Sequence, residues 1–119
     1  MKFAVLVLEG PYQHESSDSA YQFTKAALAK GHELAGVFFY QDGVVNSTKL
    51  MDPQQDDRHI QKMWGQLATE QGMEFIVCVA AAKRRGIVDE VVAPGFKISG
   101  LGQLTEMAID SDRLVTFGA

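Results

Sequence analysis

Cys78 is the only cysteine of the chain, and it lies where an apolar run, Phe75–Ala80, gives way to a basic stretch. This pattern predicts a thiol at the point where a buried strand becomes a helix. In open α/β folds the carboxyl ends of the strands form the edge at which ligands bind. The partial positive charge of a helix start and nearby cations favour the thiolate, which is the nucleophilic form of cysteine. Cys78 is therefore a candidate nucleophile, and residues 79–81 with Lys83 or Arg84 are candidate stabilisers of its charge.

The alternative is that Cys78 only packs in the core. Free cysteine is among the most buried residue types and often behaves as a small apolar side chain. Strand alternation places Ile76 and Cys78 on one face, and a sheet covered on both faces would bury that face. Lys83, Arg84 and Arg85 have an equally ordinary interpretation as the solvated side of a short helix. Spacing alone favours the packing role and leaves the catalytic one open.

Composition limits the remaining possibilities. The chain has 119 residues, 46% of them hydrophobic, a net charge of −4 and no biased stretch, which predicts one compact domain over residues 1–119. The first residues resemble neither a signal peptide nor a membrane span, so we expect a cytoplasmic protein. One cysteine and three histidines provide no disulfide, no CxxC pair and no recognisable zinc site, and we expect neither metal nor organic cofactor. The acidic balance argues against a nucleic-acid surface.

Strand-like and helix-like segments alternate along the chain. Strands are predicted at residues 2–8, 34–40, 75–80 and 113–117, with a possible short one at residues 97–98. Helices are predicted from a cap within residues 16–19 to Gly31, from Asp56 or Asp57 to Gly72, just after Cys78, and around residues 101–108. Residues 43–55 are predicted to be an exposed loop. Together these elements predict an α/β fold: a three-layer αβα sandwich of flavodoxin/Rossmann-like type, with a mainly parallel sheet of about five strands.

In such a sheet the loops at residues 10–16 and 41–55 should lie beside Cys78 and form a cleft with it. The first strand is not followed by the G-x-G-x-x-G of a dinucleotide site, and no Walker lysine is present. Glu9 is the lone acid at this edge, too few for a receiver domain that binds a divalent metal. His14 could serve as a base for Cys78, but no Asn or Asp partner is identifiable for a Cys-His hydrolase.

Several segments carry a family resemblance that covers essentially the whole chain: Glu9–His14, Ser17–Phe23, Gly31–Glu33, Val37–Tyr40, Cys78–Ala82, Arg84–Glu90 and Ile98–Gln103. Together they resemble the DsrE/TusD family of sulfur-relay proteins. Asn46–Thr48 and Gln54–His59 are more similar to DsrE of sulfur-oxidising bacteria than to TusD of the tRNA-thiolation relay. Members of this family usually have a longer segment between Glu90 and Phe96, so part of that segment is shortened or absent here.

The resemblance implies that Cys78 carries sulfur as a persulfide, accepted from one protein and passed to another. It also implies a heterohexamer with DsrF/TusC-like and DsrH/TusB-like subunits, a TusA- or rhodanese-like donor, and a DsrC/TusE-like acceptor. One cysteine suffices for such an exchange. The relay requires that the sulfur of Cys78 be reachable at the rim of the sheet.

Two other functions stay open at this point. The chain could be a non-catalytic subunit of the same assembly whose cysteine is incidental. It could also be a small-ligand or nucleotide-binding domain, because a fold does not fix a function. Sulfur oxidation and tRNA thiolation would use the same thiol chemistry, so the sequence does not separate them.

Overall fold

The computed structural model describes residues 1–118, and within them five strands form one parallel sheet. The strands are β1 (Lys2–Val7), β2 (Glu33–Phe39), β3 (Phe75–Cys78), β4 (Phe96–Ser99) and β5 (Arg113–Phe117), in the spatial order β4-β3-β2-β1-β5. The α-helices are α1 (Ser16–Ala29), α2 (Ile60–Glu70), α3 (Val79–Arg84) and α4 (Gly102–Asp110), and the 3-10 helices are η1 (Gln41–Ser47) and η2 (Asp89–Val91). The predicted α/β fold with a parallel sheet is confirmed.

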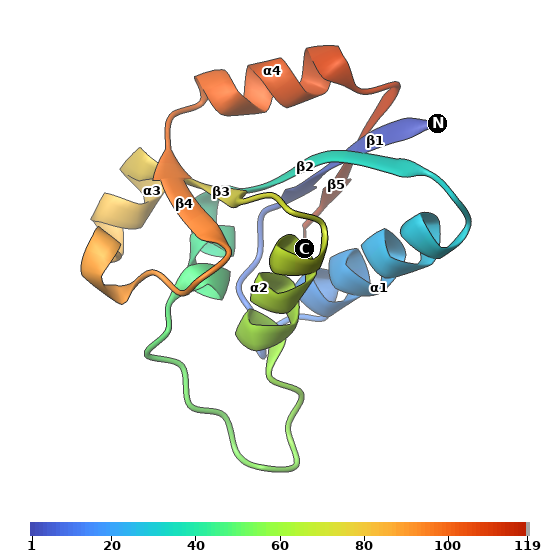
Figure 1. The fold of residues 1–119 in the computed structure, drawn as a ribbon. Helices are drawn as coiled ribbons and strands as arrows, with labels where there is room; N and C mark the ends of the chain where they lie inside the picture. The colour runs from blue at the N-terminus through green and yellow to red at the C-terminus, as the bar shows by residue number, and fades with distance from the viewer. Residues whose placement is uncertain (119) are drawn as a thin grey trace.

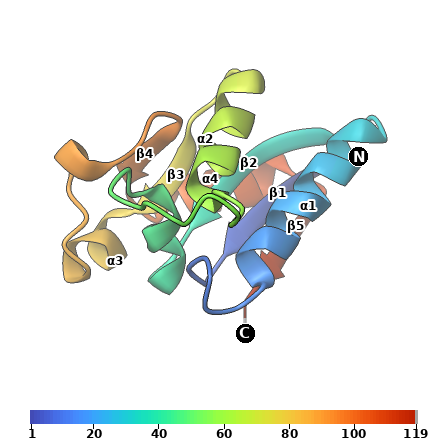
Figure 2. The same cartoon turned by 90° about the horizontal axis from the view of Figure 1, so that it is seen from below.

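The order of the strands explains the three layers. From β1 to β4 the chain steps across the sheet in one direction, and from β4 to β5 it crosses back. Because crossovers between parallel strands are right-handed, the return connection places its helix on the opposite face. Figure 1 shows α4 on one side of the sheet and α1 and α2 on the other, and Figure 2 shows the same layers from below. No helix within residues 1–118 is both long enough and apolar enough to cross a membrane.

Trp64 of α2 is the centre of the core on the face that α1 and α2 cover. Its ring is fully buried and packs edge-on against Phe39 of β2, with centroids 5.2 Å apart, and against Phe75 of β3 at 5.9 Å. Tyr21 of α1 contacts the same ring at 5.4 Å. Such pairs add stabilisation beyond the apolar area that they bury. One residue thus joins α1, α2 and two central strands.

The opposite face is covered by α4 alone. A register shift pairs Phe3 with Leu34 but Ala4 with Gly36, so a bulge at residue 35 aligns Gly36 with the face of Ala4. There Met107 is the one buried residue of α4, and a Cβ on Gly36 would lie only 3.0 Å from its Cε atom. The missing side chain of Gly36 therefore makes room for the methionine that anchors α4.

The prediction of an exposed loop over residues 43–55 is wrong for its first third. Residues 41–47 form η1, in which Gly43, Val44, Asn46 and Ser47 are buried. Gly43 lies so close to β1 that an added Cβ would be 2.1 Å from the carbonyl oxygen of Val7. A turn can be buried in this way only when its polar groups find partners inside the protein, as those of Asn46 do.

Two element boundaries also differ from the prediction. The N-cap of α2 is His59 and not Asp56 or Asp57, and its Nδ1 accepts a hydrogen bond of 3.3 Å from the backbone N–H of Lys62. β3 ends at Cys78 rather than at residue 80, because α3 begins at Val79. The strand end and the helix start therefore meet at the cysteine itself.

Candidate functional site

Cys78 is the last residue of β3 and the N-cap residue of α3. Its backbone is extended, with φ −62° and ψ 124°. The strand-to-helix junction predicted from the sequence is therefore confirmed. Phe75 packs on Trp64 beneath the sheet, so alternation turns Ile76 and Cys78 toward the face that α4 covers.

The thiol is buried in this structure. Cys78 is 1% exposed. Ile76 on the same face is 9% exposed, and Phe38, its pairing partner on β2, is fully buried. The expectation of an open cleft that contains a reachable thiol is therefore wrong for this conformation, because β3 lies between β2 and β4 and is buried over its whole length, its last side chain included.

The residues that follow Cys78 and its pairing partner on β4 are nevertheless less buried than Cys78 itself. The next residues, Val79 and Ala80, are half-buried and exposed, and Ser99, which pairs with Cys78 on β4, is half-buried. A Cβ added to Gly100 or Gly102 would meet no atom within 4 Å. The residues that follow Cys78 and its partner on β4 therefore lie nearer the surface than the cysteine itself, whereas Val77 before it is fully buried.

The cations predicted to stabilise the thiolate lie at the wrong end of α3. Lys83 and Arg84 belong to the last turn, and a six-residue helix is about 9 Å long. Cys78 also accepts no capping hydrogen bond through its side chain. The electrostatic assistance proposed for these two residues therefore stays a prediction that no contact supports.

Arg85 is the basic residue with defined contacts near this junction, although the sequence offered it only as one of three cations on the solvated side of a short helix. Its Nη1 donates to the carbonyl oxygen of Ala81 at 2.9 Å. Its Nε and Nη2 lie 2.9 and 2.8 Å from Oδ1 of Asp42, the second residue of η1. Arg85 thus ties the helix that follows Cys78 to the turn that follows β2. Asp42 is 43 residues away in the chain, so only the folded structure shows the pair.

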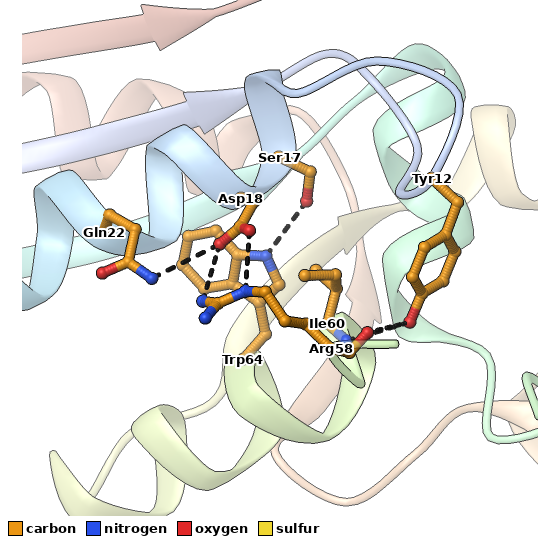
Figure 3. Close-up of polar contacts among 7 residues, drawn as sticks. All are labelled: Tyr12, Ser17, Asp18, Gln22, Arg58, Ile60 and Trp64. Carbon is orange, nitrogen blue, oxygen red and sulfur yellow. Dashed lines mark hydrogen bonds and ion pairs between the residues drawn. The ribbon is translucent and has the colours of Figure 1, made fainter. Parts of the chain in front are cut away.

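The predicted meeting of the two loops at the carboxyl edge is confirmed, since a Cβ added to Gly10 would lie 3.3 Å from the carbonyl oxygen of Asp42 and 3.6 Å from Cβ of Val45. The first loop also contacts the start of α2. The Tyr12 hydroxyl donates to the carbonyl oxygen of Arg58 at 2.6 Å and accepts from the backbone N–H of Ile60 at 3.1 Å. Arg58 also forms a two-bond ion pair with Asp18, at 2.8 and 2.9 Å (Figure 3). His14 is exposed, lines the hollow beside this cluster and lies 3.9 Å from a carboxylate oxygen of Glu9. No described contact links His14 to Cys78.

A buried polar network fixes η1 beneath this edge. The indole Nε1 of Trp64 donates to the Ser17 hydroxyl at 3.2 Å (Figure 3), and that hydroxyl donates to Oδ1 of Asn46 at 2.6 Å. The Asn46 amide in turn donates to the carbonyl oxygens of Glu9 and Gly43 at 3.0 and 2.8 Å. In residues 1–118 no buried side-chain nitrogen or oxygen lacks a partner, and no three potential metal ligands cluster. The network is therefore structural.

Comparison with known proteins gives the chain relatives over nearly its whole length. The model of the DsrE/DsrF-like family matches residues 1–117. A protein of Allochromatium vinosum named "Putative sulfurtransferase DsrE" is 60% identical over 129 aligned positions, which cover 99% of each chain. "Sulfurtransferase TusD" of Serratia proteamaculans is 49% identical and covers 94% of this chain and 96% of its own. Since this chain has 119 residues, the first alignment implies that the relative has at least ten residues that this chain lacks.

Solved structures agree with the fold. The crystal structure of the ychN protein from E. coli superposes with a TM-score of 0.84 at 25% identity, covering 98% of this chain and all of its own. A protein of unknown function, MTH1491 of Methanobacterium thermoautotrophicum, superposes with a TM-score of 0.71 at 15% identity, covering 97% of each chain. The second match concerns the fold alone.

Proposed function

The chain belongs to the DsrE/DsrF-like family, and we propose that it is a sulfurtransferase subunit in which Cys78 accepts sulfur as a persulfide and passes it on. Two full-length relatives are named as sulfurtransferases. We assign this role to Cys78 because it is the lone cysteine and lies at the carboxyl edge of the sheet, where β3 becomes α3. That edge is where α/β proteins of this architecture present their reactive groups.

Each step of the exchange needs only a thiol and a persulfide. The Cys78 thiolate attacks the outer sulfur of a donor persulfide, a new S–S bond forms, and the donor thiolate leaves as the old S–S bond breaks. An acceptor cysteine then attacks the outer sulfur on Cys78 in the same manner. No electrons are gained or lost overall, because each S–S bond formed replaces one that is broken. A single cysteine is therefore sufficient, and metal or organic cofactors are not required.

Access to the sulfur is the step that the fold must control. Cys78 is 1% exposed, so the reaction proceeds from a conformation in which the α3 junction has opened. Helices as short as α3 have little stability of their own and depend on contacts with the rest of the protein. Local openings of this kind are less costly than global unfolding. A partner that binds the edge would favour the open conformation.

The partners and the setting follow from the family. We propose assembly with DsrF/TusC-like and DsrH/TusB-like subunits as a heterohexamer in the cytoplasm, with a TusA- or rhodanese-like donor and a DsrC/TusE-like acceptor. The higher identity to the DsrE relative than to the TusD relative, 60% against 49%, favours a role in sulfur oxidation over tRNA 2-thiouridine synthesis. Direct contact with nucleic acid is not part of this proposal, since the chain has a net charge of −4.

The burial of Cys78 favours a second candidate function, that of a non-catalytic subunit with an incidental cysteine. The two functions differ in one measurable respect. The chain is incubated with a protein or small-molecule persulfide donor, and the mass of the intact chain is recorded. A sulfurtransferase gains the mass of one sulfur atom and Cys78→Ser gains none, whereas an unchanged wild-type mass identifies the structural subunit. Circular dichroism of both proteins verifies that the substitution leaves the fold intact.

A further inference from the structure

We propose that Ser99 is a positioning residue for the sulfur carried on Cys78, its hydroxyl donating a hydrogen bond to the outer, negatively charged sulfur of the persulfide. This inference rests on the proposed function and deepens it. It assigns the stabilisation of the carried sulfur to the neighbouring strand β4, whereas the sequence suggested the cations of α3.

The register places the two side chains next to each other. β3 and β4 are parallel, and Cys78 pairs with Ser99 as the last residue of each strand. Neighbouring strands lie about 4.8 Å apart, and laterally paired residues point to the same face. Phe75 and Phe96, paired three positions earlier, both belong to the aromatic cluster around Trp64 and Phe39 on the opposite face. Because side chains alternate between the two faces along a strand, Cys78 and Ser99 both point toward the face that α4 covers.

The Ser99 hydroxyl is not engaged elsewhere. No hydrogen bond from any group in residues 1–118 involves its side chain, in contrast to the fully satisfied Ser17 and Ser47. Every buried side-chain oxygen in residues 1–118 has a hydrogen-bond partner. The oxygen of Ser99 has none, so it is not buried, although the residue as a whole is half-buried. The hydroxyl is thus a donor available at the mouth of the cysteine site. The glycines that follow at positions 100 and 102 leave open space beside it.

Addition of a sulfur changes what Cys78 can reach. In the present structure no hydrogen bond joins the Cys78 thiol to Ser99. The S–S bond of a persulfide extends the side chain by about 2 Å. The outer sulfur can therefore reach groups on β4 with which the Cys78 thiol makes no hydrogen bond. A deprotonated outer sulfur is a charged acceptor, and hydrogen bonds to charged acceptors are stronger than those to neutral ones. The hydroxyl therefore retains the cargo while the site is closed.

The test compares the lifetime of the persulfide in four proteins: wild type, Ser99→Ala, Ser99→Thr and Ser19→Ala. Each is loaded with the same persulfide donor, freed of the donor, and followed by intact mass as the added sulfur is lost. Removal of a hydrogen bond to a charged group predicts a lifetime about tenfold shorter for Ser99→Ala. Ser99→Thr keeps the hydroxyl and should remain within about twofold of wild type. Ser19 is exposed on α1, so its substitution should have no effect.

Proximity is tested separately from sulfur transfer. In Ser99→Cys the second thiol should be bridged to Cys78 by a short bifunctional thiol reagent, whereas in Ser19→Cys the two thiols lie on different layers and should not be bridged. Equal lifetimes for wild type and Ser99→Ala, or failure to bridge Ser99→Cys, would overturn the role of Ser99 while leaving the proposed function in place. A wild-type chain that never acquires sulfur would instead overturn the proposed function, and the role of Ser99 with it.

Discussion

Arg85 and Asp42 join the helix that follows Cys78 to the turn that follows β2, through contacts of 2.8 and 2.9 Å to one carboxylate oxygen. The same guanidinium also holds the carbonyl oxygen of Ala81 at 2.9 Å. The pair is therefore a tie across the carboxyl edge, beside the junction that must open if Cys78 is to react. Arg85 has a half-buried side chain and Asp42 an exposed one, so the tie is weak enough to break without unfolding the protein.

Arg85→Ala should increase the rate at which Cys78 reacts with an excess of maleimide. Loss of the tie lowers the cost of opening α3 by about 1 kcal/mol, which corresponds to a rate about three- to tenfold higher. Since Cys78 is the only thiol, the signal reports this residue alone. Lys25→Ala is the control, because Lys25 is an exposed cation on α1 with no described side-chain partner in residues 1–118. Equal rates for wild type and Arg85→Ala would show that opening does not involve this tie.

Asn46→Ala should destabilise the fold by about 2–3 kcal/mol, because it leaves the Ser17 hydroxyl and two carbonyl oxygens without their partner in a buried site. Urea unfolding followed by tryptophan fluorescence measures the loss, since Trp64 belongs to the same network. Gln22→Ala, on the exposed side of α1, should change stability by less than about 0.5 kcal/mol. A similar loss of unfolding free energy in both variants would show that the buried network does not stabilise the fold more than an exposed side chain does.

Two glycine substitutions should have opposite effects. In Gly43→Ala the new Cβ would lie 2.1 Å from the backbone oxygen of Val7, so η1 must move away from β1 at a cost of about 3 kcal/mol or more. Gly102 begins α4 and faces open space, so Gly102→Ala should stabilise the protein by about 0.5 kcal/mol through its higher helix propensity. Thermal unfolding of the two variants provides the comparison. A Gly43→Ala protein as stable as wild type would contradict the close packing of η1 on β1.

Lys2 provides a prediction about pH. A hydrogen bond to Asp110, 2.7 Å away, and the further negative charges of Glu33 and Asp112 raise the pKa of Lys2 above its ordinary value of 10.5. Because the pKa is raised in the folded state, the stabilisation is complete below pH 10.5 and is lost as the pH rises through the folded value. Asp110→Asn should lower the Lys2 pKa toward 10.5 in an NMR titration of the side-chain amine and leave stability below neutral pH almost unchanged, because the group is exposed. An unshifted titration would show that the ion pair does not persist in solution.

The sequence was sufficient for the sheet and most helices, because their signals are local. The apolar runs that became β1 and β2, and the helical spacing of Ile60, Trp64 and Leu67, do not depend on distant residues. The position of Cys78 at a strand-to-helix junction also followed from a local change of composition. The resemblance to a family pointed to the cysteine and to the segment that contains Ser99, although not to a role for that serine.

The remaining features depend on contacts between distant parts of the chain. η1 is buried because Gly43 fits against β1 and Asn46 reaches Ser17, and neither contact has a signal in the local pattern. The N-cap of α2 was misassigned because two aspartates and a histidine compete within four residues, and only the geometry of the loop selects His59. Alternation placed Ile76 and Cys78 on one face, and a sheet covered on both sides predicted the burial of that face, as the 1% exposure of Cys78 confirms; it did not show how the sulfur could be reached from the edge.

The most direct test of the sulfur-carrier role follows one labelled sulfur atom. The chain is loaded from a donor persulfide that contains radiolabelled sulfur, the peptide containing Cys78 is isolated, and a second sample is mixed with an acceptor protein that presents one reactive cysteine. We predict that the label is found on the Cys78 peptide and moves to the acceptor when the acceptor is added. Label that never reaches Cys78, or that stays there in the presence of the acceptor, would contradict this prediction.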